Sequence, residues 1–141
     1  MDYFLMTAPC GQDCFNCPFY LASENKRYKR ILSKKMRIPF DKASCKGCRC
    51  DNGMPAFLDR NEPCNIMRCT QEKGVRFCFE CLDFPCDYLH PLADRASLWP
   101  HNTKVFNLCL IKKMGLEAWA RTKAKRVFET YYKEKIENLF K

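Results

Sequence analysis

The sequence predicts a small α-rich, metal-stapled domain that has irregular zinc-knuckle loops, a minor β-hairpin and C-terminal helices. The first observation is that eleven of the twelve cysteines lie between residues 10 and 86 of the 141-residue chain. The second is that apolar side chains recur at helical spacing after residue 100. We therefore expect a single domain, residues 1–141, with a cysteine-rich metal-binding part over residues 1–99 and a helical part over residues 100–141.

Residues 18–37 are predicted to form one or two amphipathic helices, because apolar side chains recur there between basic ones. Pro18 suits the first turn of a helix, where its missing N–H costs nothing. Ser23 or Asn25 could begin a second helix, and Pro39 would end it.

The stretch from Asp41 to Pro91 shows little periodicity and is interrupted by glycines and prolines. Such a segment has too few buried apolar side chains to offset its conformational entropy. Bound metal would supply the missing stability, because metal-binding free energy becomes folding free energy in small sites. The side chains of residues 75–80 alternate between apolar and polar, which predicts one edge of a short hairpin.

The C-terminal part is predicted to contain two helices. Apolar side chains from Val105 to Ile111 mark the first, and Gly115 ends it after two lysines. From Leu116 to Leu139 the apolar side chains follow the spacing of one long amphipathic helix, whose other face is basic.

The cysteines before residue 87 form four clusters, and three of these contain a Cys-x-x-Cys step. This spacing lets two thiolates reach one ion from a tight turn, as in zinc-ribbon-like sites, and a structural zinc ion takes four ligands in a tetrahedron. We therefore expect structural zinc, bound as two ions. The candidate metal ligands are Cys10, Cys14, Cys17, Cys45, Cys48, Cys64, Cys69, Cys78, Cys81 and Cys86.

Spacing alone leaves the pairing of these ligands open. One arrangement joins residues 45–48 to residues 64–69, and residues 78–81 to residues 14–17. The thiols left over would replace a ligand in either site or complete a third site with His90: Cys10, Cys50 and Cys86.

The roles of the remaining cysteines and of the two histidines are predicted from the residues around them. Cys109 lies on an apolar helical face and is predicted to be a small buried side chain, whereas Cys50 suits burial and ligation equally. His90 follows Cys86 and could ligate an ion with residues 78–86, although a loop histidine more commonly faces solvent. His101 is predicted to lie at a helix start rather than to act as a catalyst.

The formal net charge of +9 favours a nucleic-acid partner, but eight thiolates with two zinc ions would leave about +5. Residues 26–30 with Tyr20 and Tyr28, or residues 121–126 with Tyr131, could contact phosphates and stack on bases. The simpler interpretation is that these are solvated faces of amphipathic helices. A zinc-dependent adaptor that binds nucleic acid or protein is therefore an alternative function, with an unknown partner.

The N-terminal segment has no basic leader, and no run reaches the ~18 apolar residues of a membrane helix. We therefore expect a cytoplasmic protein without a membrane partner, in which the thiols stay reduced. A secreted disulfide scaffold is the disfavoured alternative.

Catalytic residues are not predicted, because the chain has no glycine-rich phosphate loop and sites made of cysteine alone are usually closed. The spacing Cys10-x3-Cys14-x2-Cys17 is shared with radical enzymes that use S-adenosylmethionine, but the chain is too short for their barrel. An iron–sulfur redox protein is the alternative to zinc, since both cofactors take four thiolates.

Five runs of the sequence resemble an uncharacterised cysteine-rich family of bacteria and archaea, domain of unknown function 3795. They are residues 8–20 (APCGQDCFNCPFY), 45–49 (CKGCR), 64–69 (CNIMRC), 72–86 (EKGVRFCFECLDFPC) and 107–119. The resemblance implies zinc binding and brings no reaction with it. Many members have further cysteines after the last helix, whereas residues 128–141 contain none.

Overall fold

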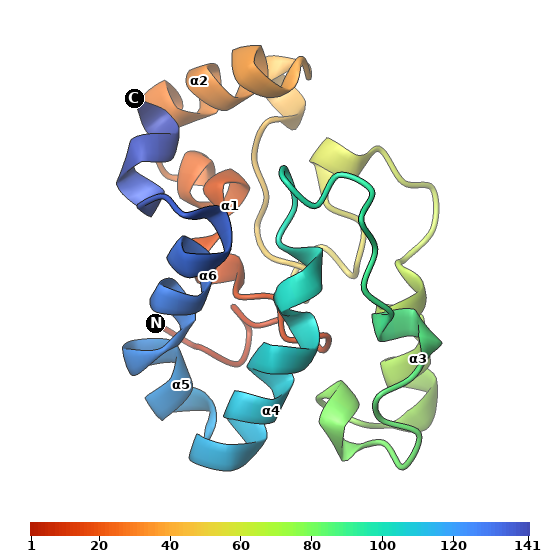
Figure 1. Cartoon of the computed structure of the whole chain (residues 1–141). Helices are drawn as coiled ribbons and strands as arrows, with labels where there is room; N and C mark the ends of the chain where they lie inside the picture. Colours follow the sequence, from red (N-terminus) through yellow and green to blue (C-terminus); the bar gives the residue numbers. More distant parts are fainter.

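The computed structural model describes all 141 residues as short helices joined by long loops (Figure 1). The six α-helices are α1 (Pro18–Ser23), α2 (Lys26–Met36), α3 (Asn65–Lys73), α4 (Lys104–Met114), α5 (Leu116–Thr122) and α6 (Ala124–Tyr132). Seven short 3-10 helices, η1 to η7, lie before, between and after them. The helix-rich class predicted from the sequence is confirmed.

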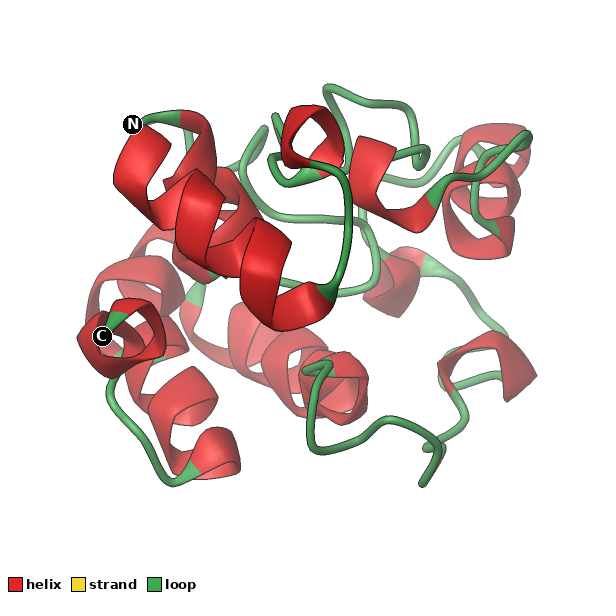
Figure 2. Cartoon of the chain, turned by 90° about the horizontal axis from the view of Figure 1, so that it is seen from above, coloured by secondary structure: helices red, strands yellow, loops and turns green.

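The structure contains no β-strand, and Figure 2 shows only helices and loops. A single isolated antiparallel bridge joins Thr7 to Asp13. The hairpin expected at residues 75–80 is not formed, because this segment bends into the 3-10 helix η4 (Cys78–Glu80). The N–H of Glu80 donates locally to the carbonyl of Phe77 at 3.0 Å, whereas the N–H of Cys78 donates to the carbonyl of Pro9 at 3.0 Å. These single bonds do not form the ladder of a hairpin.

Residues 18–37 form two helices. Pro18 is the first residue of α1, as predicted. Asn25 caps α2, and its side-chain oxygen accepts hydrogen bonds from the N–H groups of Arg27 at 2.9 Å and Tyr28 at 3.2 Å. Helix α2 ends where Arg37 adopts a left-handed conformation (φ 56°), two residues before Pro39.

Helix α3 was not predicted from the sequence. Its cap is unusual, since the sulfur of Cys64 accepts a hydrogen bond from the N–H of Met67 at 3.3 Å. The helix ends at Gly74, which adopts the left-handed conformation (φ 66°) typical of a C-cap glycine. The helix has only nine residues, with one cysteine as its cap and another in its middle, and its helical pattern was therefore not recognised.

Helix α4 ends before Gly115, as predicted, but the long helix expected from Leu116 to Leu139 is divided into α5, α6 and η7 (Ile136–Phe140). The backbone leaves helical geometry at Lys123 (φ −125°) and again at Lys133, which is left-handed (φ 55°). Both α5 and α6 place apolar side chains in the core. The apolar spacing continues across the breaks, so the pattern did not reveal them.

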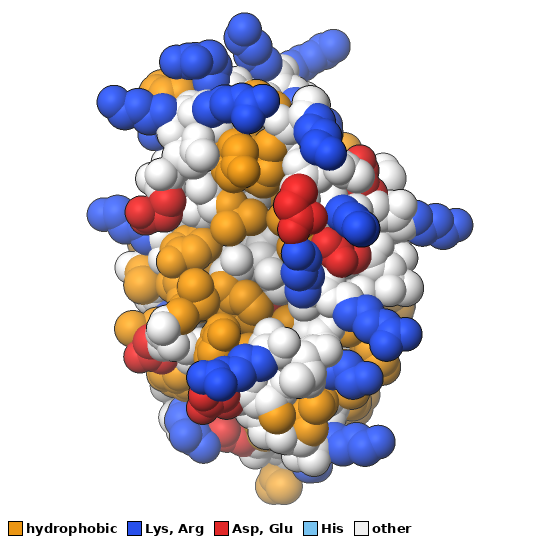
Figure 3. Space-filling model, turned by 90° about the vertical axis from the view of Figure 1, so that its left-hand side faces the viewer, with side chains coloured by type: hydrophobic (Ala, Val, Ile, Leu, Met, Phe, Trp, Pro, Cys, Tyr) orange, Lys and Arg blue, Asp and Glu red, His pale blue; other side chains and the backbone are white.

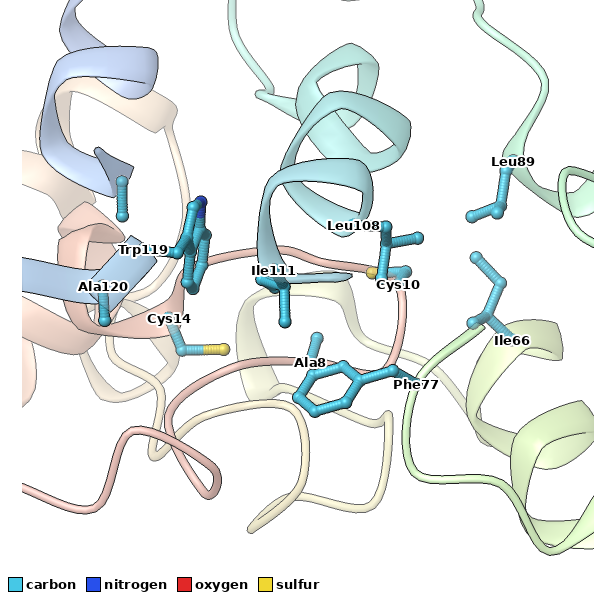
Figure 4. Close-up of a cluster of buried hydrophobic side chains, with 11 residues drawn as sticks. Ala8, Cys10, Cys14, Ile66, Phe77, Leu89, Leu108, Ile111, Trp119 and Ala120 are labelled. Atoms are coloured by element: carbon cyan, nitrogen blue, oxygen red, sulfur yellow. The ribbon is translucent and has the colours of Figure 1, made fainter. Parts of the chain in front are cut away.

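The main core joins the cysteine-rich part to the C-terminal helices (Figure 4). Gly11 lies so close to α4 that a β-carbon there would be 2.8 Å from the carbonyl oxygen of Lys104. The buried side chain of Asn107 donates to the carbonyl of Gly11 at 2.9 Å and accepts from the indole of Trp119 at 3.3 Å. The N-terminal segment is therefore fixed against α4 and α5 by packing and by hydrogen bonds.

A second, smaller core lies between α1, α2 and η7, near the C-terminus in Figure 1. Tyr28 stacks on Phe140 with ring centroids 3.8 Å apart. Phe19 stacks on Phe57 at 3.9 Å, and Trp99 lies against both rings. No helix in the structure has the length and apolar character needed to cross a membrane.

Candidate metal centre

Four thiols from two distant segments line one cavity of about 280 Å³, and we call them the inner cysteine group: Cys14, Cys17, Cys45 and Cys48. Cys14 begins the 3-10 helix η1 (Cys14–Asn16), and Cys17 follows it at the start of α1. The other two lie in the loop that follows η2 (Phe40–Lys42). Residues 14–17 therefore lie beside residues 45–48, and not beside residues 78–81 as the spacing had suggested.

Backbone hydrogen bonds hold the two segments of the inner group together. The N–H of Cys45 donates to the carbonyl of Phe19 in α1 at 3.0 Å. The N–H of Cys48 points at the sulfur of Cys14 at 3.5 Å, and the N–H of Gly47 donates to the sulfur of Cys45 at 3.2 Å. Gly47 has a positive φ of 105°, which lets the loop turn its N–H groups toward sulfur.

A second set of four thiols lines a cavity of about 30 Å³, and we call it the outer cysteine group: Cys69, Cys78, Cys81 and Cys86. Cys69 lies on α3, and the others follow within the next seventeen residues. The N–H of Asp83 donates to the sulfur of Cys81 at 3.4 Å, and the ammonium of Lys73 lies 3.2 Å from the same sulfur. A cavity of this size holds about one water molecule or one ion.

The other predicted ligands lie outside these two groups. Cys10 is buried in the main core near Leu108 (Figure 4), and Cys64 caps α3. Cys50 is exposed. Cys10 therefore does not line the same cavity as Cys14 and Cys17, despite the spacing that these three residues share with a class of iron–sulfur enzymes.

The prediction for Cys109 is wrong, because this cysteine is exposed on α4 rather than buried. The buried side chains of α4 are Asn107, Leu108 and Ile111, and this face leaves Cys109 on the solvent side. His90 is exposed, and its ring nitrogen lies 2.9 Å from the carbonyl of Pro91. His101 begins η6 (His101–Thr103), which leads into α4, as predicted for a residue at a helix start.

The sulfurs of each group surround a common cavity without meeting at one point. No group of three or more cysteine, histidine, aspartate or glutamate side chains is close enough together to hold a metal ion as the side chains stand. All twelve cysteines are free thiols. Ligation would therefore require the thiol side chains to rotate toward the centre of their cavity.

The electrostatics of the inner group disfavour several thiolates in the absence of a cation. Burial raises the pKa of Cys17 to about 12 and also raises the pKa of Cys45. A hydrogen bond shared between Cys14 and Cys48 lowers the pKa of the first and raises that of the second. In the outer group, burial raises the pKa of Cys78 to about 12. A divalent cation would reverse this balance, because thiolates are stabilised by coordination to metal.

A buried carboxyl group, Asp13, also lines the inner cavity. Its side chain is 4% exposed and accepts a hydrogen bond from the amide of Asn16 at 2.7 Å. Burial raises the pKa of Asp13 to about 7. Asp13 was not predicted as part of the site, because an aspartate beside a cysteine loop is usually solvated.

Arg49 is a second residue that the sequence did not single out. Its guanidinium group donates to the carbonyls of Phe4 at 3.0 Å, Thr7 at 2.8 Å and Arg76 at 2.6 Å. It also lies over the ring of Phe4, 4.1 Å from the centroid. Arg49 therefore connects three segments to one another: the N-terminal segment, the loop of the inner group and the segment that leads to the outer group.

The sequence pattern of one protein family matches most of the cysteine-rich part. The family is described as "Protein of unknown function (DUF3795)", and the match covers residues 6–91, which include both cysteine groups. Comparison with curated proteins and with solved structures gave no significant match. The match spans more than half of the 141-residue chain, and the protein therefore belongs to the DUF3795 family.

Proposed function

We propose that this protein is a zinc-binding domain in which the inner and outer cysteine groups each hold one structural zinc ion. The observation that carries the proposal is the distribution of the thiols, since eight of the cysteines line two cavities with four in each. Four cysteine thiolates are a complete ligand set for structural zinc. Bound zinc would hold together loops that otherwise have little packing.

Hydrogen bonds to sulfur support the proposal in both groups. Cys14 and Cys45 receive backbone N–H groups in the inner group, and Cys81 receives one in the outer group. Donors of this kind stabilise the charged thiolate that a metal requires. Zinc binding needs reduced thiols, and a cytoplasmic location belongs to this proposal for that reason.

An iron–sulfur cluster is the alternative occupant of the inner group. The inner cavity, at about 280 Å³, has more room than a single ion needs, and clusters are also held by four thiolates. The outer cavity, at about 30 Å³, favours a single ion.

Metal analysis of protein purified without oxygen tests the proposal. We expect a colourless sample that contains two zinc ions per chain and that loses folding cooperativity when a chelator removes them. A brown sample that contains iron and sulfide would show that the cysteines hold an iron–sulfur cluster instead of zinc. A chain that carries no metal and unfolds identically with and without chelator would refute metal binding altogether.

A further inference from the structure

Helix α2 carries a surface of cations, all exposed except the half-buried Lys29, which we call the basic face: Lys26, Arg27, Lys29, Arg30, Lys34, Lys35 and the cap residue Arg37. None of these side chains forms an ion pair, although seven ion pairs occur elsewhere in the molecule. In Figure 3 lysine and arginine side chains crowd the end of the molecule that α2 occupies, and the acidic side chains lie further down.

This arrangement of charge is unfavourable for the helix itself. Lys26 and Arg30 are four residues apart, as are Arg30 and Lys34, and like charges at this spacing repel. Cations also occupy the first turn of α2, which has no acidic residue, and there they oppose the helix dipole. Glutamate in the first turn would favour the helix dipole, and glutamate alternating with lysine along the helix would replace repulsion by attraction. The run of cations therefore indicates an anionic partner.

The other basic region of the sequence does not share this property. Arg121 pairs with Glu117 at 2.7 Å, and Lys125 pairs with Glu137 at 2.6 Å. Tyr131, which the sequence suggested as a base-stacking residue, donates its hydroxyl to the carbonyl of Ala96 at 2.6 Å. Lys123 and Arg126 of this region form no ion pair, but the basic face of α2 has more unpaired cations on a single helix.

A membrane surface is the less suitable anion. An amphipathic helix that lies on lipid inserts an apolar face between the acyl chains. The apolar side of α2 is already used inside the protein, where Leu32 is buried and Tyr28 stacks on Phe140. The basic face therefore matches a polymer of phosphates better than it matches a bilayer.

An exposed aromatic ring stands at the edge of the basic face. Phe40 follows α2, is 45% exposed, and lies under the ammonium of Lys29 at 4.9 Å from the ring centroid. Tyr28, the ring expected from the sequence to stack on bases, is held against Phe140 instead. Proteins that bind single strands combine cations on the backbone with an aromatic ring that stacks on a base.

We propose that the basic face of α2 binds the phosphate backbone of single-stranded nucleic acid, with Phe40 stacking on one base. The lysines and arginines would release counterions from the phosphates, so affinity would fall steeply as salt rises. This inference does not depend on which metal the cysteine groups hold.

Fluorescence anisotropy with a labelled 20-nucleotide single strand of mixed sequence tests the proposal. The 141-residue chain is used as purified, with potassium chloride from 50 to 200 mM. Replacement of three outward cations, Lys26→Gln/Arg30→Gln/Lys34→Gln, is expected to lower affinity about tenfold at low salt. The slope of log affinity against log salt should become shallower by about 2. The matched control Lys112→Gln/Lys113→Gln/Lys123→Gln removes the same charge from exposed sites at α4 and α5, and should change affinity less than about twofold.

Equal losses in the two triple variants would overturn the proposal, because net charge alone would then explain binding. Binding to vesicles that contain 30% phosphatidylserine, without binding to the oligonucleotide, would also overturn it. Phe40→Ala should weaken binding to the single strand several-fold and leave binding to a duplex of the same sequence unchanged. A duplex that binds more tightly than the single strand would contradict the role of Phe40.

Discussion

The inner and outer cysteine groups contain four thiols each, but the chain delivers them differently. The inner group joins residues 14–17 to residues 45–48, whereas the outer group lies within residues 69–86. Cys14 and Cys45 are 6% and 7% exposed, whereas Cys86 is on the surface. A metal in the inner group would therefore link distant segments at the core, and a metal in the outer group would stabilise one local loop.

The largest expected effect comes from removing inner ligands. Cys45→Ser/Cys48→Ser would leave two buried thiols without their metal and release the loop from α1. We expect the free energy of unfolding to fall by roughly 5 kcal/mol or more, with loss of a single cooperative transition. Denaturation in guanidinium followed by tryptophan fluorescence measures this, since Trp119 is fully buried and Trp99 stacks near the inner group.

The matched outer variant Cys78→Ser/Cys81→Ser sharpens the comparison. Its unfolding transition should remain cooperative, and the increase in hydrogen exchange should be confined to residues 65–90. Cys109→Ser, at an exposed site on α4, serves as the neutral control. If the outer variant unfolds as completely as the inner one, the distinction between a global and a local site is wrong.

The pH dependence of stability should also differ between the two regions. The pKa of Asp13 in the folded chain is about 7, against 3.8 for the ordinary group. Between these values the folded state keeps a proton that the unfolded state has lost, so stability falls as pH rises, by about 1.4 kcal/mol per pH unit. Bound zinc would not cancel this effect. Four thiolates around one zinc ion leave a net charge of −2, which does not stabilise the Asp13 carboxylate.

Asp13→Asn should therefore stabilise the protein relative to wild type above pH 7 by a few kcal/mol, and should have little effect near pH 4. Urea denaturation of both proteins at pH 4 to 8 gives this difference directly. Asp83→Asn, at a carboxylate of the outer region that is 74% exposed, should show no comparable trend. A difference between wild type and Asp13→Asn that stays constant with pH would contradict the burial argument.

Arg49 connects the two regions, and its removal should affect both. Arg49→Met would leave the carbonyls of Phe4, Thr7 and Arg76 without this donor, at a cost of roughly 2–3 kcal/mol. Arg49→Lys keeps the charge but lacks the planar guanidinium group, and its stability should lie between that of Arg49→Met and that of the wild type. Thermal unfolding of the three proteins would show whether the order holds, and an unchanged Arg49→Met protein would refute the linking role.

The smallest effect is expected at Lys73, which forms an ion pair with Asp83 in which both side chains are exposed. Lys73→Met should lower the free energy of unfolding only slightly, because solvent screens such pairs. A similar loss in buffer with 1 M salt would contradict a screened interaction and would point to the contact with Cys81 at 3.2 Å instead.

Local structure was predicted well where short-range rules apply. Asn25 as a helix cap, Pro18 in a first turn and Gly115 as a helix end each depend on a few neighbouring residues. Helix α3 was missed because a cysteine supplies its cap, and the break at Lys123 was missed because apolar spacing continues across it. The membership of the family was evident from the ordered cysteine motifs, and the match over residues 6–91 confirms it.

The arrangement of the candidate site depended on long-range packing, which spacing does not contain. The chain spacing shows which thiols are neighbours along the sequence, but Gly11 and Asn107 help to decide which segments lie side by side. Spacing does not reveal the roles of Asp13 and Arg49, since the first follows from burial and the second from hydrogen bonds to carbonyls of distant segments.

X-ray absorption at the zinc edge of the purified protein tests the central claim most directly, because it reports the atoms around the metal. The proposal predicts four sulfur neighbours per zinc at about 2.3 Å, averaged over the inner and outer groups. A shell made mainly of nitrogen or oxygen atoms would contradict it, because the zinc would then be bound outside the two cysteine groups.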